Sequence, residues 1–256
     1  MLICLDAGHY LGTPGKRCLK NIDPRETREW VLNARAADKV QQLLEAYDCK
    51  TMRVDDVTGQ EEVTLYERVR AANRAGADLY LSIHHNAGIN GGSGGGIVVY
   101  VCPGADGISK GVQQAVYQHT VARTGLKGNR ANPMPEGNLY VLNATAMPAV
   151  LGEFGFMDST TDTPMILTET FADQLARGIV EALVEVYGLK EVETVTYEQW
   201  KSFMNRYQQE QEQLPPSDWA QEGLAQAKAR GITDGTRPQS EATRQEVALM
   251  INAALK

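Results

Sequence analysis

Three short apolar runs in this 256-residue chain each lead into side chains that can bind a metal ion or work beside one. The runs and their polar successors are residues 2–5 with His9, residues 79–83 with His84, His85 and Asn86, and residues 149–151 with Glu153. Strands buried on both faces read as continuous hydrophobic runs and are usually parallel. Open α/β sheets place their chemistry just beyond the carboxyl ends of such strands. The pattern predicts an α/β fold with a mostly parallel central sheet, and two imidazoles and a carboxylate at one edge indicate a zinc hydrolase.

A fourth metal-binding candidate comes from a predicted helix. Pro24, which follows Asp23, marks a helix start, and residues 25–47 carry an apolar stripe with a period of about 3.6 residues. At about 100° per residue, Glu29 falls in the middle of this stripe and Glu26 at its edge. Carboxylates are rarely buried unless they are paired or bound to metal, so Glu29 is a candidate ligand. The alternative is that Glu29 lies in a frayed, solvated first turn, where the helix dipole favours it.

Five segments of the chain occur in a recognisable order, at residues 5–9, 29–33, 65–73, 82–87 and 148–156. Together they resemble the zinc-dependent N-acetylmuramoyl-L-alanine amidases of the third amidase family, which cut bacterial peptidoglycan. The resemblance covers roughly residues 1–188. It implies a phosphorylase/hydrolase-like fold, with a mixed central sheet flanked by helices, and one catalytic zinc ion per chain held by two histidines and a glutamate.

The resemblance also implies which residues do the work. His9 matches the first histidine ligand, and Glu29 matches the glutamate ligand because Asn33 stands four residues later, where the family has an asparagine. His84 matches the histidine of the family's Ser-Ile-His-x-Asn-Ala pattern. Glu153 matches the catalytic glutamate.

The residue after His84 departs from the family pattern, because His85 stands where a small residue is more usual. Adjacent strand residues face opposite sides, so spacing alone does not separate His84 from His85 as the ligand. His85 is expected to be a substrate contact or a partner behind the ligands. Asn86 and Arg130 are further candidate substrate-binding residues. Arg130 lies in a Gly-, Asn- and Pro-rich loop, where it either binds a peptide carboxylate or is a plain surface arginine.

The implied chemistry is hydrolysis of an amide. A catalytic zinc keeps three protein ligands and one open position. It lowers the pKa of its bound water to about 7 and polarises the scissile carbonyl. Glu153 would take the proton from that water and pass it to the leaving amine of L-alanine. The alternative is that Glu153 is a helix-capping or salt-bridging carboxylate.

Composition restricts the possible partners and the place of action. A formal net charge of -7 argues against nucleic-acid binding, which favours basic patches. No run of about 18 apolar residues is present, so no membrane span is expected. His9 already lies where a leader peptide would be, so no signal peptide is expected either. The expected partner is bacterial peptidoglycan.

The expected absence of a leader predicts a phage endolysin, which is made in the host cytoplasm and reaches the cell wall after holin-type release. One alternative is a bacterial autolysin or sporulation-type amidase that lacks its leader. Another alternative is a catalytically weak protein that only binds the wall.

The chain is expected to divide into a catalytic domain at residues 1–189, a linker at 190–196 and a small all-α domain at 197–256. A helix over residues 163–187, ending at Gly188, is expected to close the catalytic domain. Residues 197–214 carry large or amphipathic side chains spaced 3, 4, 3, 4 and 3 apart, namely Tyr197, Trp200, Met204, Tyr207, Gln211 and Leu214. This spacing is typical of a short coiled-coil seam, or of an amphipathic helix that packs on the tail or on the catalytic domain.

The tail reads as two helices, one over residues 219–230 and one that begins at Thr243 with a capping box to Glu246. The tail also contains Trp219, Ala225, Gly231-Ile232, Gly235 and Thr243-Arg244-x-Glu246. This pattern resembles a single S-layer homology repeat, a family that binds wall-linked polysaccharide, usually through several copies. About 40 residues rarely hold a stable core alone, so the repeat is expected to pack on residues 197–214 or on another copy. We therefore expect a homo-oligomer, which would restore multivalent wall binding through avidity.

Overall fold

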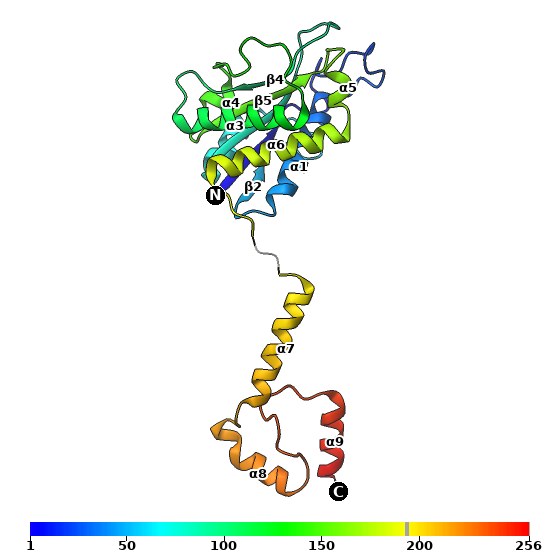
Figure 1. Cartoon of the computed structure of the whole chain (residues 1–256), viewed down its shortest axis with the longest axis vertical. Helices are drawn as coiled ribbons and strands as arrows, with labels where there is room; N and C mark the ends of the chain where they lie inside the picture. The colour runs from blue at the N-terminus through cyan, green and yellow to red at the C-terminus, as the bar shows by residue number, and fades with distance from the viewer. Residues whose placement is uncertain (193–194, 256) are drawn as a thin grey trace. The chain divides into compact units, whose positions relative to one another are not determined.

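The computed structural model describes residues 1–192 and 195–255, and the chain divides into two compact units, Met1–Val192 and Glu193–Lys256. The N-terminal unit is built on a five-stranded sheet in the order β2-β1-β3-β5-β4 (Figure 1). The strands are β1 (Leu2–Ala7), β2 (Lys50–Arg53), β3 (Leu79–Asn86), β4 (Ile97–Tyr100) and β5 (Ala149–Phe156). All neighbours are parallel except β4 and β5, which are antiparallel. The predicted mixed α/β sheet is therefore confirmed.

Helices cover both faces of this sheet (Figure 1). They are α1 (Glu29–Leu44), α2 (Leu65–Ala75), α3 (Gly107–Thr124), α4 (Tyr140–Asn143), α5 (Thr163–Ile166) and α6 (Glu169–Tyr187). Successive strand residues point to opposite faces. In β3, for example, Leu79 and Leu81 join the core that contains α1, α3 and α6, whereas Tyr80 joins the smaller core under α2 and α4.

The helix predicted over residues 25–47 is shorter in the structure and begins at Glu29. The cause is Asp23, whose carboxylate accepts hydrogen bonds from the backbone N–H groups of Arg25 and Thr27 and holds this segment in turns. The helix predicted over residues 163–187 is also divided, because the Thr168 hydroxyl caps a new helix start at α6. Both changes show side-chain capping prevailing over an apolar stripe that continues through the break.

All three strands predicted from apolar runs extend further than those runs, and β1 continues to Ala7. β3 continues through His84 to Asn86, and β5 continues through Glu153 to Phe156. The two candidate functional side chains therefore lie within paired strands and not in the loops that follow them. Backbone pairing fixes their spacing more tightly than a loop would.

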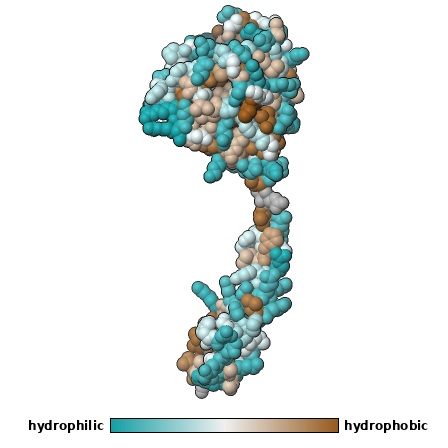
Figure 2. Space-filling view, turned by 90° about the vertical axis from the view of Figure 1, so that its left-hand side faces the viewer, coloured by the Kyte–Doolittle hydropathy of each residue, from teal (hydrophilic) through white to brown (hydrophobic). Residues whose placement is uncertain are grey.

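The C-terminal unit is all-α, as predicted, with α7 (Tyr197–Gln213), a 3₁₀ turn at Asp218–Ala220, α8 (Gln221–Ala229) and α9 (Arg244–Ala254). The single helix expected over residues 219–230 is thus a turn followed by α8. The capping box of Thr243 and Glu246 is confirmed at the start of α9. None of the described residues 195–255 is buried, and Figure 2 shows apolar side chains on the surface of this unit.

The linker expected at residues 190–196 lies partly outside the described residues, which omit 193 and 194. Lys190 and Val192 are hydrogen-bonded to Asp48 and Ala46 and so belong to the N-terminal unit. No helix within residues 1–192 and 195–255 combines the length and the apolar character needed to cross a bilayer.

Candidate metal centre

Three side chains predicted as metal ligands converge at the carboxyl edge of the sheet. His9 follows β1, Glu29 is the first residue of α1, and His84 lies in β3. Their ligand atoms all lie within 4.8 Å of one another. The Glu29 carboxylate reaches both imidazoles, at 3.3 Å from Nε2 of His9 and 3.0 Å from Nδ1 of His84. Residues distant in the sequence thus form one compact group of two nitrogens and a carboxylate, a donor set that suits a zinc ion.

The local backbone makes this close approach possible. A Cβ atom on Gly8 would lie only 2.0 Å from Cε1 of His84, so the ring occupies space that only glycine leaves free. The next residue, His9, has a φ of 67°, in the left-handed region that a non-glycine residue adopts only when its surroundings hold it there. The bend at Gly8 and His9 turns the His9 ring, at the end of β1, toward Glu29.

Glu29 is 1% exposed, which excludes the solvated first turn considered above. Burial alone would raise the pKa of its carboxyl group, but the contacts and charge of His84 and His9 hold that pKa well below its usual range. Oε2 lies 3.3 Å from Nε2 of His9 and 3.7 Å from the Lys16 ammonium, but neither contact has the geometry of a hydrogen bond. A buried, ionised carboxylate with a free oxygen beside two imidazoles fits a bound cation.

Glu153 stands beside this group on the neighbouring strand. It is the register partner of His84 across β3 and β5. Its Oε2 atom is shielded from solvent and has no hydrogen-bond partner among the described residues. Burial raises the pKa of Glu153 to about 7, with His84 opposing the rise and Glu29 adding to it. A carboxyl group with this pKa can accept and release a proton near neutral pH, as a general base and acid must.

His85 points away from the ligand group. It is 3% exposed, and its Nδ1 atom lies 2.8 Å from Oδ1 of Asn33 on α1. A side chain this deeply buried does not reach a substrate, so of the two roles considered for His85 the structure is compatible with the partner behind the ligands. The His85 ring contacts α1, whereas the His84 ring lies with His9 and Glu29, so His84 and not His85 belongs to the candidate ligand group.

The other two candidate substrate residues lie at the same edge of the sheet. Asn86 ends β3 and is partly exposed, and its side-chain oxygen accepts a hydrogen bond from the backbone of Ala87. Arg130 is exposed, with its guanidinium 4.5 Å from the ring centroid of Phe156 at the end of β5. Substrate binding by Asn86 and Arg130 stays a prediction.

Sequence reasoning missed the role of Arg68, on α2. Its guanidinium lies 2.5 Å from a carboxylate oxygen of Asp6 and 2.8 Å from the carbonyl oxygens of Ala7 and His9. Asp6 also accepts a hydrogen bond from Ser82. Although burial alone would raise the pKa of Asp6, the Arg68 charge lowers it. Arg68 and Val69 both lie on the buried face of α2, and an arginine among the apolar residues of that face is the signal that could have identified it.

Comparison with known proteins agrees with this geometry. The chain belongs to the N-acetylmuramoyl-L-alanine amidase family Amidase_3, whose pattern matches residues 3–185. It is 33% identical over 193 residues to the endolysin of Bacillus phage SPP1, which covers 74% of this chain and 67% of the endolysin. It is also 33% identical over 135 residues to the sporulation-specific N-acetylmuramoyl-L-alanine amidase of Bacillus subtilis (strain 168), covering 52% of this chain. The chain spans about half the length of that amidase, 49%.

Solved structures show the same fold. The catalytic domain of CwlV, an N-acetylmuramoyl-L-alanine amidase from Bacillus (Paenibacillus) polymyxa var. colistinus, superposes with a TM-score of 0.65 at 25% identity. The match covers 74% of this chain and 99% of that domain. An N-acetylmuramoyl-L-alanine amidase from Clostridium difficile 630 gives the same TM-score at 28% identity, covering 73% of this chain and 96% of that one.

Proposed function

We propose that this protein is a zinc-dependent N-acetylmuramoyl-L-alanine amidase, which cleaves the amide bond between N-acetylmuramic acid and the L-alanine of the stem peptide. The observation that carries the proposal is the convergence of His9, Glu29 and His84 beside Glu153, the register partner of His84. The family match over residues 3–185 supports it. One zinc ion per chain would be held by the two histidines and Glu29.

The chain's own residues divide the work between binding and proton transfer. Zinc held by these three ligands would supply Lewis-acid chemistry at the scissile carbonyl. Glu153, with a pKa raised to about 7, accepts a proton from the attacking water and donates it to the leaving nitrogen. The products are a lactyl carboxylate on the sugar and a free amino group on alanine. Asn86 and Arg130 would contact the peptide from the rim.

The decisive experiment is digestion of purified peptidoglycan by the zinc-loaded and the chelated protein. New N-terminal alanine that appears only with zinc supports an amidase. Glu153→Gln should retain one zinc per chain while its rate falls by about 10²–10⁴-fold, the range expected for loss of a general base. Glu61→Gln, an exposed glutamate of the same unit, is the matched control. Full digestion in excess chelator, or new reducing sugar ends instead of alanine, would refute the proposal.

The similarity to a phage endolysin favours a lytic role, in which the enzyme is made in the host cytoplasm and acts on the wall after holin-type release. The similarity to a sporulation-specific amidase favours a second candidate, a bacterial enzyme that acts on the wall of its own cell. Expression in a Gram-positive host separates the two roles. An endolysin leaves the cells intact until a holin is co-expressed and then lyses them, whereas lysis or wall remodelling without a holin favours the bacterial role.

For the C-terminal unit, we propose wall-polysaccharide binding by an S-layer-homology-like repeat that assembles into a homo-oligomer. Its described residues include none that are buried, and Trp219 is 89% exposed, so the unit lacks the core that would stabilise it alone. The seam of α7, which contains Trp200 and Tyr207, is the surface we assign to self-association.

Light scattering of the full chain at several concentrations tests this assembly. An oligomer that Trp200→Glu converts to a monomer supports it, and Ser202→Glu, on the same helix but outside the seam, is the matched control. A wild-type monomer of 28.1 kDa at all concentrations would refute it.

A further inference from the structure

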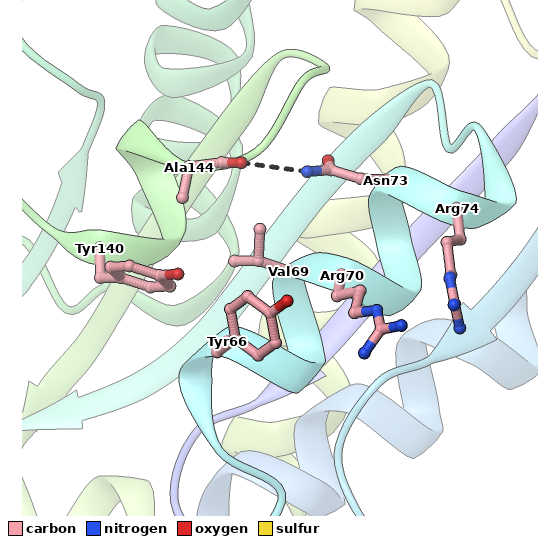
Figure 3. A pocket seen from close by; sticks show the side chains of 7 residues that line it. All are labelled: Tyr66, Val69, Arg70, Asn73, Arg74, Tyr140 and Ala144. Atoms are coloured by element: carbon pink, nitrogen blue, oxygen red, sulfur yellow. Dashed lines mark hydrogen bonds between the residues drawn. The ribbon is translucent and has the colours of Figure 1, made fainter.

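A second pocket lies between α2 and α4, on elements that carry none of the candidate metal ligands. Its volume is about 470 Å³. Figure 3 shows Tyr66, Arg70 and Arg74 projecting from successive turns of α2, with Tyr140 of α4 nearby. Neither the amidase chemistry nor the family resemblance gives these residues a role.

The frame of the pocket is fixed by hydrogen bonds and by buried apolar contacts. The Asn73 side chain donates to the carbonyl oxygen of Ala144 at 3.1 Å, drawn as a dashed line in Figure 3. The same side chain accepts from the backbone N–H of Ala146 at 2.8 Å. Val69 belongs to the buried core under α2 and α4. The pocket is therefore preformed, as small-ligand sites usually are.

The two tyrosines present large rings to solvent. Tyr66 is 59% exposed and Tyr140 is 46% exposed. In Figure 3 neither hydroxyl is hydrogen-bonded to another of the residues drawn, so both can bind a ligand. An aromatic ring with a polar tip suits a partner that has both C–H surface and hydroxyl groups, such as a sugar or another polyol.

The two arginines give this part of an acidic protein a local positive charge. Arg70 and Arg74 are four residues apart on α2, where like charges repel. Neither forms an ion pair in the described part of the chain, whereas Arg53, Arg68 and Arg123 each pair with a carboxylate. Two guanidinium groups without partners favour an anionic ligand, because their fixed forks match phosphate oxygens.

We propose that this pocket binds a phosphodiester-linked, sugar-bearing polyol chain of the cell wall. Arg70 and Arg74 hold successive phosphates, and Tyr66 and Tyr140, which follow Arg70 on the side away from Arg74 in Figure 3, pack against the units next to these phosphates. This inference rests on the proposed function, because a wall hydrolase meets such polymers around its substrate. Binding there would hold the catalytic unit on the wall although the chain's net charge of -7 opposes adsorption to an anionic surface.

Titration calorimetry with the full-length chain and purified wall teichoic acid, a polymer of this class, tests the proposal. The double variant R70A/R74A should bind about tenfold more weakly or worse, because two charge-assisted contacts are lost. Arg177→Ala removes another exposed arginine of the same unit and should stay within about twofold of wild type. The polymer is soluble and the assay contains chelator, so no cleavage takes part in the result.

Binding to whole walls identifies the source of the anion. Hydrofluoric acid cleaves phosphodiesters and leaves peptidoglycan with its stem-peptide carboxylates. The difference between wild type and R70A/R74A should be present on intact walls and vanish on extracted walls. Equal affinities for the soluble polymer, or a difference that persists on extracted walls, would overturn the proposal. A chain without amidase activity that still shows the difference would refute the proposed function and leave this site standing.

Discussion

Asn33 and His85 form a buried hydrogen bond behind the candidate ligands, with 2.8 Å between Oδ1 and Nδ1. The same amide donates to the carbonyl oxygen of Gly8 at 3.0 Å, and the His85 backbone N–H donates to Glu29 at 3.3 Å. Burial lowers the pKa of His85 to about 3, so its ring is neutral and donates from Nδ1. The pair thus connects α1 to the strand ends that carry both candidate histidine ligands.

Replacement of His85 should therefore weaken zinc binding without removing a ligand. In His85→Leu, Asn33 loses its partner and holds Gly8 less firmly, so we expect zinc affinity to fall by about tenfold, at the low end of the effect of such supporting partners. Competition with a chelating dye measures the affinity. His85→Gln keeps an N–H donor and should recover most of the loss, and His119→Gln on α3 is the control. Unchanged affinity in His85→Leu would show that the pair does not position the ligands.

Gly8→Ala should abolish metal binding. The new Cβ would fall 2.0 Å from the His84 ring, so the ring must leave its position or the strand must move. Gly111→Ala on α3 is the matched control, since nothing lies within 4 Å of its Cβ. In that helix interior alanine should raise the free energy of unfolding by about 0.5–1 kcal/mol. Zinc content and urea unfolding of both variants check the contrast, and a zinc-loaded Gly8→Ala would contradict it.

The raised pKa of Glu153 predicts a pH-dependent stability. The folded, metal-free protein holds a proton on Glu153 up to about pH 7, whereas the unfolded chain releases it near the ordinary value of 4.5. The folded state therefore binds more protons in this window, and stability falls as pH rises through it. Glu153→Gln removes this loss, so its stability gain in chelator should be larger at pH 8 than at pH 5. Urea titrations at both pH values measure it, with Glu61→Gln as control. An equal stability gain at pH 5 and pH 8 would show that folding does not raise the pKa of Glu153.

Arg68→Ala should be strongly destabilising because it leaves the Asp6 carboxylate buried without its partner. Breaking a buried ion pair costs about 3–5 kcal/mol, and two carbonyl contacts are lost as well. Arg70 lies two residues further along α2 and is exposed, so Arg70→Ala should change the free energy of unfolding by less than about 0.5 kcal/mol. Equilibrium urea unfolding measures the stability of both variants. A similar loss of stability in Arg68→Ala and Arg70→Ala would refute the prediction.

The sheet and the three ligand candidates could be predicted because each depends on a strong pattern. Continuous apolar runs identified β1, β3 and β5, and the position of Glu29 on an apolar stripe singled it out from Glu26. Helix ends were predicted less well. The start of α1 at Glu29 depends on hydrogen bonds to Asp23, and the break before α6 depends on the cap formed by Thr168. These side chains act locally and leave the apolar periodicity of the sequence unchanged.

What the sequence did not reveal depends on contacts between distant residues. The partner of His85 is Asn33, 52 positions earlier, and the partner of Arg68 is Asp6, 62 positions earlier. Both contacts depend on the strand order of the folded sheet, so no spacing in the sequence predicts them. The pocket around Tyr66 and Tyr140 also could not be predicted from the sequence, because its two sides come from α2 and α4, which lie far apart along the chain.

The strand order has a consequence for when catalytic competence arises. His9, His84 and Glu153 belong to β1, β3 and β5 or their ends, three consecutive strands in the middle of the sheet. The last of these is made only after more than half of the chain, and every pairing between them joins distant segments. In the proposed mechanism, a growing polypeptide would thus carry the candidate ligands but not Glu153 until β5 is made and pairs with β3, and long-range pairings of this type form slowly. An incomplete chain that lacks β5 would therefore lack the proposed catalytic group.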